Sequence, residues 1–224
     1  MEQPKVILLD AVGTLVGVKG SVGEVYGDIA RKYGVEVPAP SLNQAFFLSF
    51  QAAEPMAFPG TGADEIPTRE FEWWLAIARC TFQRAGVFEQ FLDFSSFFAE
   101  LYAHFATPLP WFVYPDVLPA LRHWQKKGIE LGLVSNLDSR IYAIFQAFDL
   151  AQFFTTITIS SEAGAAKPNP QIFRASLQKH HCQPGDAWHV GDSYKEDYQA
   201  AKSIGIRGIW LKREKGINGG SAQT

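Results

Sequence analysis

From residue 115 onward, short apolar runs alternate with helical segments, and this alternation constrains the fold more than any other feature. The apolar runs, which we expect to be buried strands, are 129–134, 154–160, 187–190 and 206–211. The expected helices are 116–127, 139–150, 170–180 and 194–204. Strands that alternate with helices of this length predict an α/β fold, in which a parallel sheet is doubly wound with helices over both faces.

A further buried strand is expected at the N-terminus, where Val6–Leu9 form a continuous apolar run. The run ends on Asp10, a carboxylate for which an apolar strand has no structural use, and Gly13 and Thr14 follow. Open α/β sheets bind their ligands at the carboxyl ends of their strands, which is where Asp10 would lie. Taken alone, the motif leaves two interpretations open, a ligand-binding acid or a residue that caps a turn.

The region between these parts is helical and rich in aromatic residues. Helices are expected at 22–33, 41–51, 68–84 and 88–105, after a glycine-rich loop or tight hairpin at 17–23. Packing is the expected role of the aromatic side chains, which include Phe46, Phe47, Phe50, Trp73, Trp74, Phe82, Phe91, Phe94, Phe98 and Phe105. We therefore expect a core of residues 1–16 and 112–211, an inserted helical domain of residues 17–111, and a flexible polar tail, 212–224.

Composition excludes several classes of protein. The net charge of −3 argues against a nucleic-acid or anionic-membrane surface, and no apolar run approaches the length of a membrane span. The two cysteines, Cys80 and Cys182, form neither a zinc cluster nor a disulfide framework. The N-terminus lacks the pattern of a signal peptide. A cytoplasmic location is expected, whereas the sequence does not predict the oligomeric state.

Polar residues follow several of the expected strands and should meet at one edge of the sheet. They are Asp10, Ser135, Asn136, Lys167, Asp192 and, in the next helix, Asp197. Carboxylates in one crevice repel unless a cation lies between them, and Mg²⁺ prefers such oxygen ligands. A hydroxyl, backbone N–H groups and a lysine can hold phosphate oxygens. The set predicts phosphoryl transfer through an aspartyl phosphate.

The same residues carry a family resemblance. The segments LLDAVGTL, LVSN, KPNPQIF and HVGDSYKED resemble, in order, the four motifs of the haloacid dehalogenase-like hydrolase superfamily. The resemblance covers the first strand and everything from about residue 116 onward, and the helical insert lies where that superfamily carries its cap domain. The aromatic segment with Trp73 and Trp74 resembles the branch named for rhythmically expressed gene products.

The resemblance implies a role for each motif residue. Asp10 would be the nucleophile and, through its other oxygen, a ligand of Mg²⁺. The backbone carbonyl of Val12 would be a second ligand group. Asp192 would be the next ligand from a side chain, and Asp197 would support the metal or its waters.

The remaining motif residues are implied to bind the phosphoryl group of a small phosphorylated substrate. Ser135, the backbone at Asn136 and Lys167 would contact its oxygens, which makes Lys167 the catalytic partner of Asp10. Thr14 would steady the turn after the nucleophile.

One position departs from the family pattern. Phosphatases of this superfamily usually have an aspartate two residues after the nucleophile as general acid and base, and here that residue is Val12. Losing such a group typically costs ~10²–10⁴-fold in rate. A proton could come from water or from a cap acid, Asp64, Glu65 or Glu70, or the leaving group could need none, as in an acyl phosphate. Strand alternation places Val12 beside Asp10 unless the turn has already begun.

Three other functions compete with phosphatase activity. A haloacid dehalogenase also lacks the second aspartate but needs no metal, whereas Asp192 and Asp197 are kept here. A phosphonate hydrolase uses a cap lysine, and there is no Lys from Tyr33 to Gln125. The third alternative is a weak or inactive protein of this fold that binds a phosphorylated ligand or a protein partner; Val12 favours it, and the intact acids and lysine argue against it.

Overall fold

The computed structural model describes residues 3–213. The chain forms two compact units. Of the described residues, the first contains 3–17, 56–66 and 112–213. The second contains Val18–Pro55 and Pro67–Trp111.

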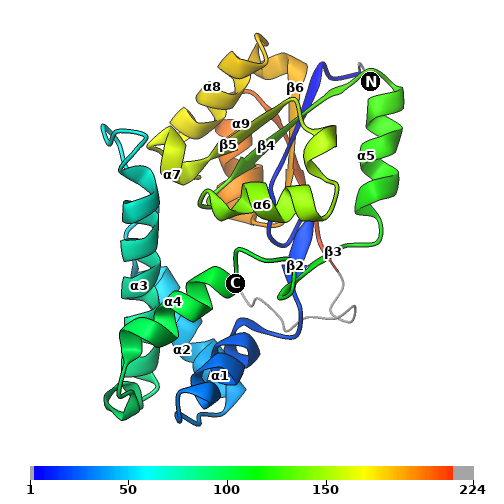
Figure 1. Cartoon of the computed structure of the whole chain (residues 1–224). Helices are drawn as coiled ribbons and strands as arrows, with labels where there is room; N and C mark the ends of the chain where they lie inside the picture. The colour runs from blue at the N-terminus through cyan, green and yellow to red at the C-terminus, as the bar shows by residue number, and fades with distance from the viewer. Residues whose placement is uncertain (1–2, 214–224) are drawn as a thin grey trace. The chain divides into compact units, whose positions relative to one another are not determined.

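A five-stranded sheet of parallel pairs forms the centre of the first unit, in the order β5-β4-β1-β6-β7 (Figure 1). The strands are β1 (Val6–Leu9), β4 (Glu130–Ser135), β5 (Thr156–Ile159), β6 (Ala187–Gly191) and β7 (Arg207–Trp210). β1 lies in the middle, and its Leu8 pairs with Gly132 on one side and His189 on the other. The chain order reverses at β1, so the carboxyl end of β1 is a switch point where such sheets bind ligands.

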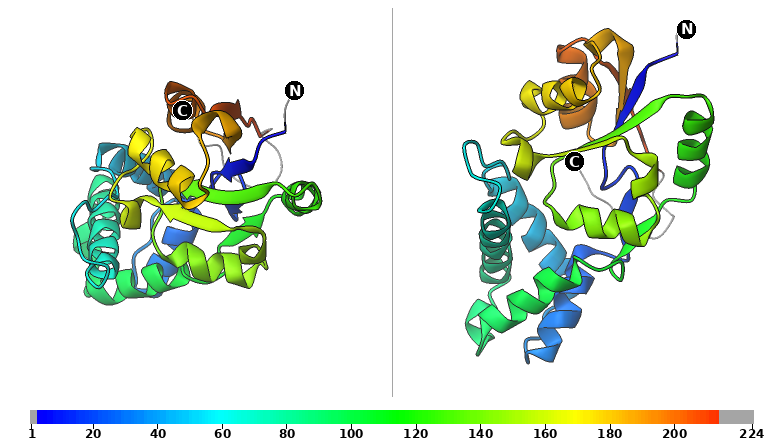
Figure 2. Two further views of the ribbon diagram at one scale, coloured as in Figure 1. Left: turned by 90° about the horizontal axis from the view of Figure 1, so that it is seen from above. Right: turned by 45° about the horizontal axis from the view of Figure 1, so that its top comes forward.

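Helices cover both faces of this sheet (Figures 1 and 2). One face is covered by α5 (Val117–Lys126) and α6 (Arg140–Ala147), and the other by α8 (Pro170–Lys179) and α9 (Ala200–Ser203). Val6 and Leu8 share a buried core with Phe173 of α8, while Ile7 and Leu9 are equally buried. Burial on both faces explains why β1 is continuously apolar. The expected doubly wound α/β fold is confirmed.

Shorter elements connect the main strands and helices of the first unit. They are η2 (Ala151–Phe153), α7 (Ser160–Ala163), η3 (Pro184–Asp186) and the π-helical turn η4 (Tyr194–Gln199). The helix expected at 194–204 is therefore two pieces, η4 followed by α9. Within residues 3–213, no helix is both long and apolar enough to cross a lipid bilayer.

The second unit is helical. It contains α1 (Val22–Lys32), α2 (Ala39–Ala52), most of α3 (Ile66–Arg84), η1 (Phe88–Gln90) and α4 (Phe94–His104). Its buried core is largely aromatic, and the rings of Phe82 and Phe97 meet edge to face with centroids 5.0 Å apart. Packing is thus the observed role of these side chains.

Two helix boundaries in this unit differ from expectation. α3 begins at Ile66, so Thr68 lies inside its first turn and not at the expected N-cap. The single helix expected at 88–105 is interrupted, because Asp93 caps α4 and accepts a hydrogen bond from the Ser96 amide at 3.0 Å. The chain before Asp93 forms the separate turn η1.

Two short strands were not predicted. β2 (Val16–Val18) and β3 (Trp111–Val113) form a two-stranded sheet. β2 overlaps the start of the loop or tight hairpin expected at 17–23. A Cβ atom on Gly17 would lie 2.6 Å from the Phe112 ring, so a larger residue there would require that ring to move. Strands of three residues show no readable alternation, and their partner is far away in sequence.

The segment Met56–Ile66 groups with the α/β unit, although we expected it within the helical insert. Met56 and Ile66 are buried, and the ideal Cβ position on Gly164 lies 3.0 Å from Cα of Pro59. The chain passes from one unit to the other after Gly17 and again after Trp111. Of the expected tail, residues 214–224 lie outside the described residues, and Arg213 makes specific contacts described below.

Candidate active site

Asp10 directly follows β1 and is buried, with 6% of its surface exposed. Its amide still donates to the Val190 carbonyl at 2.9 Å, as a continuation of the sheet. The chain then turns, and the Ala11 carbonyl accepts hydrogen bonds from the amides of Leu15 and Val16 at 2.7 and 3.0 Å. The turn has therefore begun before Val12, so strand alternation does not determine where Val12 points.

Gly13 is required in this turn for two reasons. Its φ of +86° lies in the left-handed region, which L-residues with a Cβ rarely adopt. A Cβ atom at Gly13 would also lie 2.3 Å from Oδ2 of Asp192. Residues 11–15 are called the nucleophile loop below, after the role expected of Asp10. The backbone of this loop approaches the Asp192 carboxylate so closely at Gly13 that a side chain there would require Asp192 to move.

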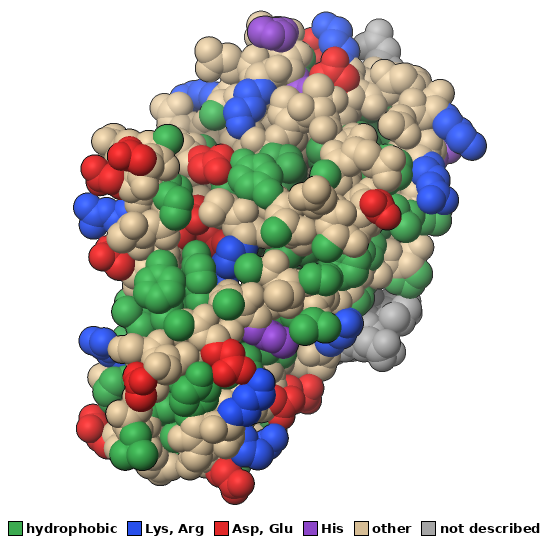
Figure 3. All heavy atoms as spheres, viewed as in Figure 1, with side chains coloured by type: hydrophobic (Ala, Val, Ile, Leu, Met, Phe, Trp, Pro, Cys, Tyr) green, Lys and Arg blue, Asp and Glu red, His purple; other side chains and the backbone are tan. Residues whose placement is uncertain are grey.

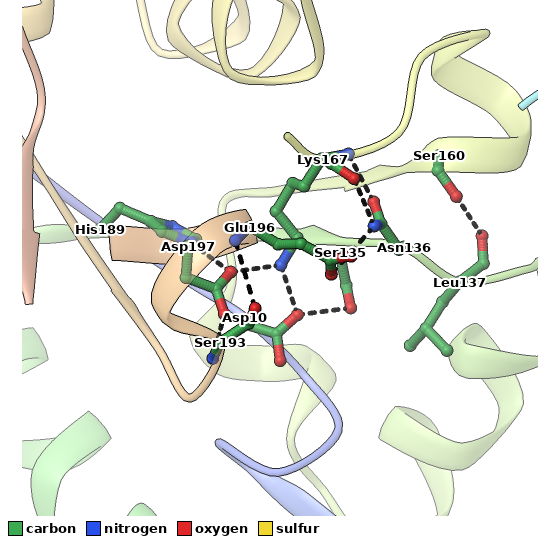
Figure 4. A network of polar contacts seen from close by, with 10 residues as sticks. All are labelled: Asp10, Ser135, Asn136, Leu137, Ser160, Lys167, His189, Ser193, Glu196 and Asp197. Atoms are coloured by element: carbon green, nitrogen blue, oxygen red, sulfur yellow. Dashed lines mark hydrogen bonds and ion pairs between the residues drawn. The ribbon is translucent and has the colours of Figure 1, made fainter. Parts of the chain in front are cut away.

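Lys167 joins two buried carboxylates (Figure 4). Its Nζ donates to Oδ1 of Asp10 and to Oδ1 of Asp197, each at 2.6 Å. The hydroxyl of Ser135 donates to the same Asp10 Oδ1 at 2.8 Å. Among the described residues, Oδ2 of Asp10 has no hydrogen-bond partner. The two oxygens of Asp10 are thus unequal, one held by two donors and one left open.

Asn136 fixes the backbone that carries Lys167. Its Oδ1 accepts from the Lys167 amide at 2.7 Å, and its Nδ2 donates to the Lys167 carbonyl at 2.8 Å. The same Nδ2 lies 3.4 Å from Oε2 of Glu196. We expected a phosphate contact from the backbone at Asn136; the structure adds a role for its side chain in positioning Lys167.

Asp10, Asp192 and Asp197 can offer ligand atoms that all lie within 4.8 Å of one another. Asp10 and Asp197 are buried and Asp192 is exposed. Three carboxylates face one ammonium group here, so negative charge is in excess. An all-oxygen donor set with excess negative charge fits a hard divalent cation such as Mg²⁺.

The excess negative charge affects the pKa of Asp192. Although Asp192 as a residue is exposed, the surrounding protein removes water from its carboxylate, and this loss of solvation together with the negative charges of Asp10 and Asp197 raises the pKa of Asp192 to about 7. Burial likewise raises the pKa of Asp10, with Lys167 acting in the opposite direction. A cation between these groups would favour their charged forms.

Lys167 and Asp197 form the most firmly charged pair in the site. Burial alone would lower the pKa of Lys167, but the charges of Asp10 and Asp197 outweigh it and raise that pKa. Burial would raise the pKa of Asp197, but Lys167 and a hydrogen bond from His189 hold it well below its usual range. Both groups remain charged near neutral pH.

Two contacts of Asp197 were not anticipated. His189 is completely buried, and its Nε2 lies 2.9 Å from Oδ1 of Asp197; because that oxygen is charged, we assign the proton to Nε2. The amide of Ser193 donates to Oδ2 of Asp197 at 2.9 Å. His189 lacks metal-ligand spacing in the sequence, and its position on β6, three residues before Asp192, was the only available signal.

The other predicted residues have simpler surroundings. The Oγ1 atom of Thr14 is buried and has no hydrogen-bond partner among the described residues. Thr14 enters the turn through its amide, which donates to the Ala11 carbonyl at 3.3 Å. Asp64 and Glu65 are exposed, and Glu70 is completely buried.

Fold and site together define a hydrolase of the haloacid dehalogenase-like class. The profile of that family matches residues 4–205, and the chain belongs to it.

Two relatives place the chain more narrowly. The chain is 33% identical to haloacid dehalogenase-like hydrolase domain-containing protein 3 of Bos taurus, over 91% of this chain and 80% of that protein. It is 29% identical to the rhythmically expressed gene 2 protein of Drosophila melanogaster, over 90% and 80% respectively. The resemblance to this branch is thereby confirmed.

Solved structures share the fold. A HAD phosphatase from Thermococcus onnurineus superposes with a TM-score of 0.59 at 25% identity, over 96% of this chain and 90% of that chain. The L-2-haloacid dehalogenase from Xanthobacter autotrophicus superposes with a TM-score of 0.65 at 18% identity, over 91% and 76%. The latter likeness concerns the fold alone.

Proposed function

We propose that this protein is a Mg²⁺-dependent phosphatase of small phosphorylated metabolites that works through a phosphoenzyme on Asp10. One observation carries the proposal. The carboxylate of Asp10 is held at one oxygen by Lys167 and Ser135, and open at the other. Asp192 and Asp197 lie alongside it. A fixed nucleophile beside phosphate-binding donors and a set of hard oxygen ligands matches the demands of phosphoryl transfer.

The reaction would proceed in two displacements. In the first, an oxygen of Asp10 attacks phosphorus, the bond from phosphorus to the leaving oxygen breaks, and the leaving group departs with the bonding electrons. In the second, water attacks phosphorus, the bond to Asp10 breaks, and phosphate and a proton are released. Lys167 and Ser135 lie where they can donate to the oxygens of the transferred group.

Asp10, Asp192, Asp197 and the backbone carbonyl of Val12 would hold the Mg²⁺ ion. When bound, the ion supplies positive charge that offsets the charge of the phosphoryl oxygens. Lys167 would remain the only cation from the chain within this set of residues, and Asn136 keeps its backbone in place.

Val12 determines which substrates suit the site. A valine cannot move a proton, so a leaving group that departs as an alkoxide must take its proton from water or from another residue. Acyl phosphates and activated aryl phosphates leave as stable anions and need no such proton. We therefore expect these classes to turn over faster than sugar phosphates.

Two observations support phosphatase over dehalogenase activity. Dehalogenation needs no metal, whereas Asp192 and Asp197 complete a set of metal-binding oxygens with Asp10. The solved structure at 25% identity is described as a phosphatase. We also retain the cytoplasmic location as a proposal, since both cysteines are unpaired, in keeping with a reducing compartment.

The second candidate function is a non-catalytic protein that binds a phosphorylated ligand or a protein partner. Val12 is the observation that favours it. Lys167 donates hydrogen bonds to both Asp10 and Asp197, and the first of these holds the carboxylate of Asp10 in place. This arrangement argues for catalysis, because a protein that only binds a ligand does not need a positioned nucleophile.

A substrate screen tests the proposal. Sugar phosphates, acyl phosphates and an activated aryl phosphate are offered to the full chain with Mg²⁺ and with a chelator. We expect Mg²⁺-dependent release of phosphate, abolished in Asp10→Asn and retained in the matched control Asp186→Asn, a half-buried acid whose carboxylate accepts a hydrogen bond from Lys5. Binding of phosphorylated ligands without any turnover would support the second candidate and contradict the first.

A further inference from the structure

Arg213 ties the chain after β7 to the loop that follows Asp10. Its Nε donates to the Gly13 carbonyl at 3.2 Å, and its Nη2 donates to the Thr14 carbonyl. Nη1 pairs with Oδ1 of Asp116 at 2.8 Å. The guanidinium carbon also lies 3.6 Å from the ring centroid of Tyr114. One side chain thus joins three distant parts of the chain.

These contacts hold the part of the nucleophile loop that lies near Asp10 and Asp192. Gly13 and Thr14 are the third and fourth residues after Asp10, and the Cα of Gly13 abuts the Asp192 carboxylate. The loop therefore contacts both Arg213, which binds its carbonyls, and Asp192. Hydrogen bonds from a charged donor are about twice as strong as neutral ones, and the Arg213 side chain is only 20% exposed.

Asp116 explains how the guanidinium is oriented. We expected Asp116 to cap α5, yet its side chain makes no capping hydrogen bond there. Its carboxylate instead pairs with Nη1 of Arg213, and Nη2 lies 3.4 Å from its second oxygen. Asp116, at the start of α5, thus orients the guanidinium of Arg213 toward the nucleophile loop.

We propose that Arg213 is a positioning residue for the reaction on Asp10. It fixes the nucleophile loop so that Asp10 and Asp192 keep their relative places. The fork of the guanidinium is essential, because two carbonyls and a carboxylate are held at once and an ammonium group lacks that geometry. The kinetic part of this inference rests on the proposed phosphatase function, whereas the structural part does not.

Hydrogen exchange tests the structural part without any substrate. In the full chain, Arg213→Gln is compared with wild type and with the control Lys212→Gln, whose ammonium lies over the Trp210 ring. We expect the amides of Leu15 and Val16 to exchange ~10-fold faster in Arg213→Gln, because lost charged hydrogen bonds loosen the turn. Exchange in β4 should not change. Equal exchange in all three proteins would overturn the proposal.

Kinetics on an activated aryl phosphate test the functional part. We expect kcat of Arg213→Gln to fall roughly 10-fold or more with KM nearly unchanged, since small misplacements of reacting groups cost up to about 10²-fold. Arg213→Lys should not restore kcat, and Lys212→Gln should match wild type. An unchanged kcat in Arg213→Gln, or full rescue by lysine, would contradict the inference. If wild type turned over no phosphate, the proposed function would fail while the exchange result still decided the role of Arg213.

Discussion

Lys167 neutralises two carboxylates that would otherwise repel each other in a buried site. Its Nζ lies 2.6 Å from Asp10 and 2.6 Å from Asp197, and all three side chains are almost inaccessible to solvent. A buried charge network of this kind tolerates little change, because removing one partner leaves the others unpaired.

Replacing Lys167 by methionine should therefore reduce stability as well as activity. We expect the free energy of unfolding to fall by about 3–5 kcal/mol, the usual result of breaking a buried ion pair. Lys179→Met is the matched control, since the exposed Lys179 loses one hydrogen bond to the Ile157 carbonyl and should cost only about 1 kcal/mol. Denaturant unfolding of both variants measures the difference. Equal losses would contradict the central role of Lys167.

Val12→Asp should change the choice of substrate. If proton transfer limits turnover, the rate on sugar phosphates rises, with ~10²–10⁴-fold as the ceiling, while the rate on an activated aryl phosphate barely changes. Repulsion between the new acid and Asp10 reduces the gain. Steady-state kinetics on both substrates decide the matter. Equal wild-type rates on the two classes would show that another residue already supplies the proton.

The chemistry of single residues could be predicted where a motif carries it. Asp10, Ser135 and Lys167 follow strands of one sheet, and parallel topology alone brings them together. His189 and Arg213 could not be predicted in the same way. His189 contacts Asp197 only because the turn after β6 folds back, and Arg213 stands in a polar segment without a motif.

The turn after β1 depends on glycine. Gly13 has a φ of +86°, and a Cβ atom on Gly13 would lie 2.3 Å from Oδ2 of Asp192. Two effects are therefore combined at one position, backbone conformation and close approach.

A comparison of Gly13→Ala with Gly128→Ala separates the effect of backbone conformation from the effect of the close approach to Asp192. Gly128 also has a positive φ, +70°, but nothing lies within 4 Å of a Cβ there, so its alanine variant should lose only the ~1–2 kcal/mol of left-handed strain. Gly13→Ala should lose more and also lose activity, because the new methyl group displaces Asp192. Unfolding and rate measurements on both variants suffice. Comparable effects in the two variants would argue against the close approach.

Elements with a long, clear pattern were the predictable ones. The apolar run of β1 and the helical spacing of α1 and α8 define their place within a few residues. β2 and β3 contain three residues each, so their pairing depends on contacts that local sequence does not encode. Asp116 was assigned to a helix cap because local sequence could not reveal its distant partner, Arg213.

The face shown in Figure 3 carries charged side chains of both signs beside apolar side chains. The site is different, since its charges are concentrated and buried. The α/β class was predictable from the alternation of strands and helices, whereas the assignment of Met56–Ile66 to the α/β unit was not. Its buried ends, Met56 and Ile66, flank a polar loop that carries no pattern.

Stability should depend jointly on pH and Mg²⁺. The pKa of Asp192 is about 7 in the folded chain, against 3.8 for an ordinary aspartate. The folded state therefore binds this proton more tightly than the unfolded state, and stability of the metal-free protein falls as pH rises between these values. A bound cation removes the penalty on the charged form. The gain in Tm on adding Mg²⁺ should be larger at pH 8 than at pH 5.

Asp192→Asn is the control for this prediction. In this variant the gain in Tm on adding Mg²⁺ should differ much less between pH 5 and pH 8, because the carboxyl group that titrates has been removed. The Tm of each protein is measured at pH 5 and at pH 8, in each case once with a chelator and once with Mg²⁺. A Mg²⁺ effect that is equal at both pH values in wild type would contradict the assignment of Asp192 to the cation site.

The phosphoenzyme on Asp10 is the central claim, and rapid acid quenching during turnover of an activated aryl phosphate tests it most directly. Mass spectrometry of the peptide that contains Asp10 should show an added phosphoryl group with Mg²⁺ present. The group should be absent with a chelator and in Asp10→Asn. Sustained phosphate release by Asp10→Asn, or a phosphoryl group found on another residue during wild-type turnover, would contradict the account.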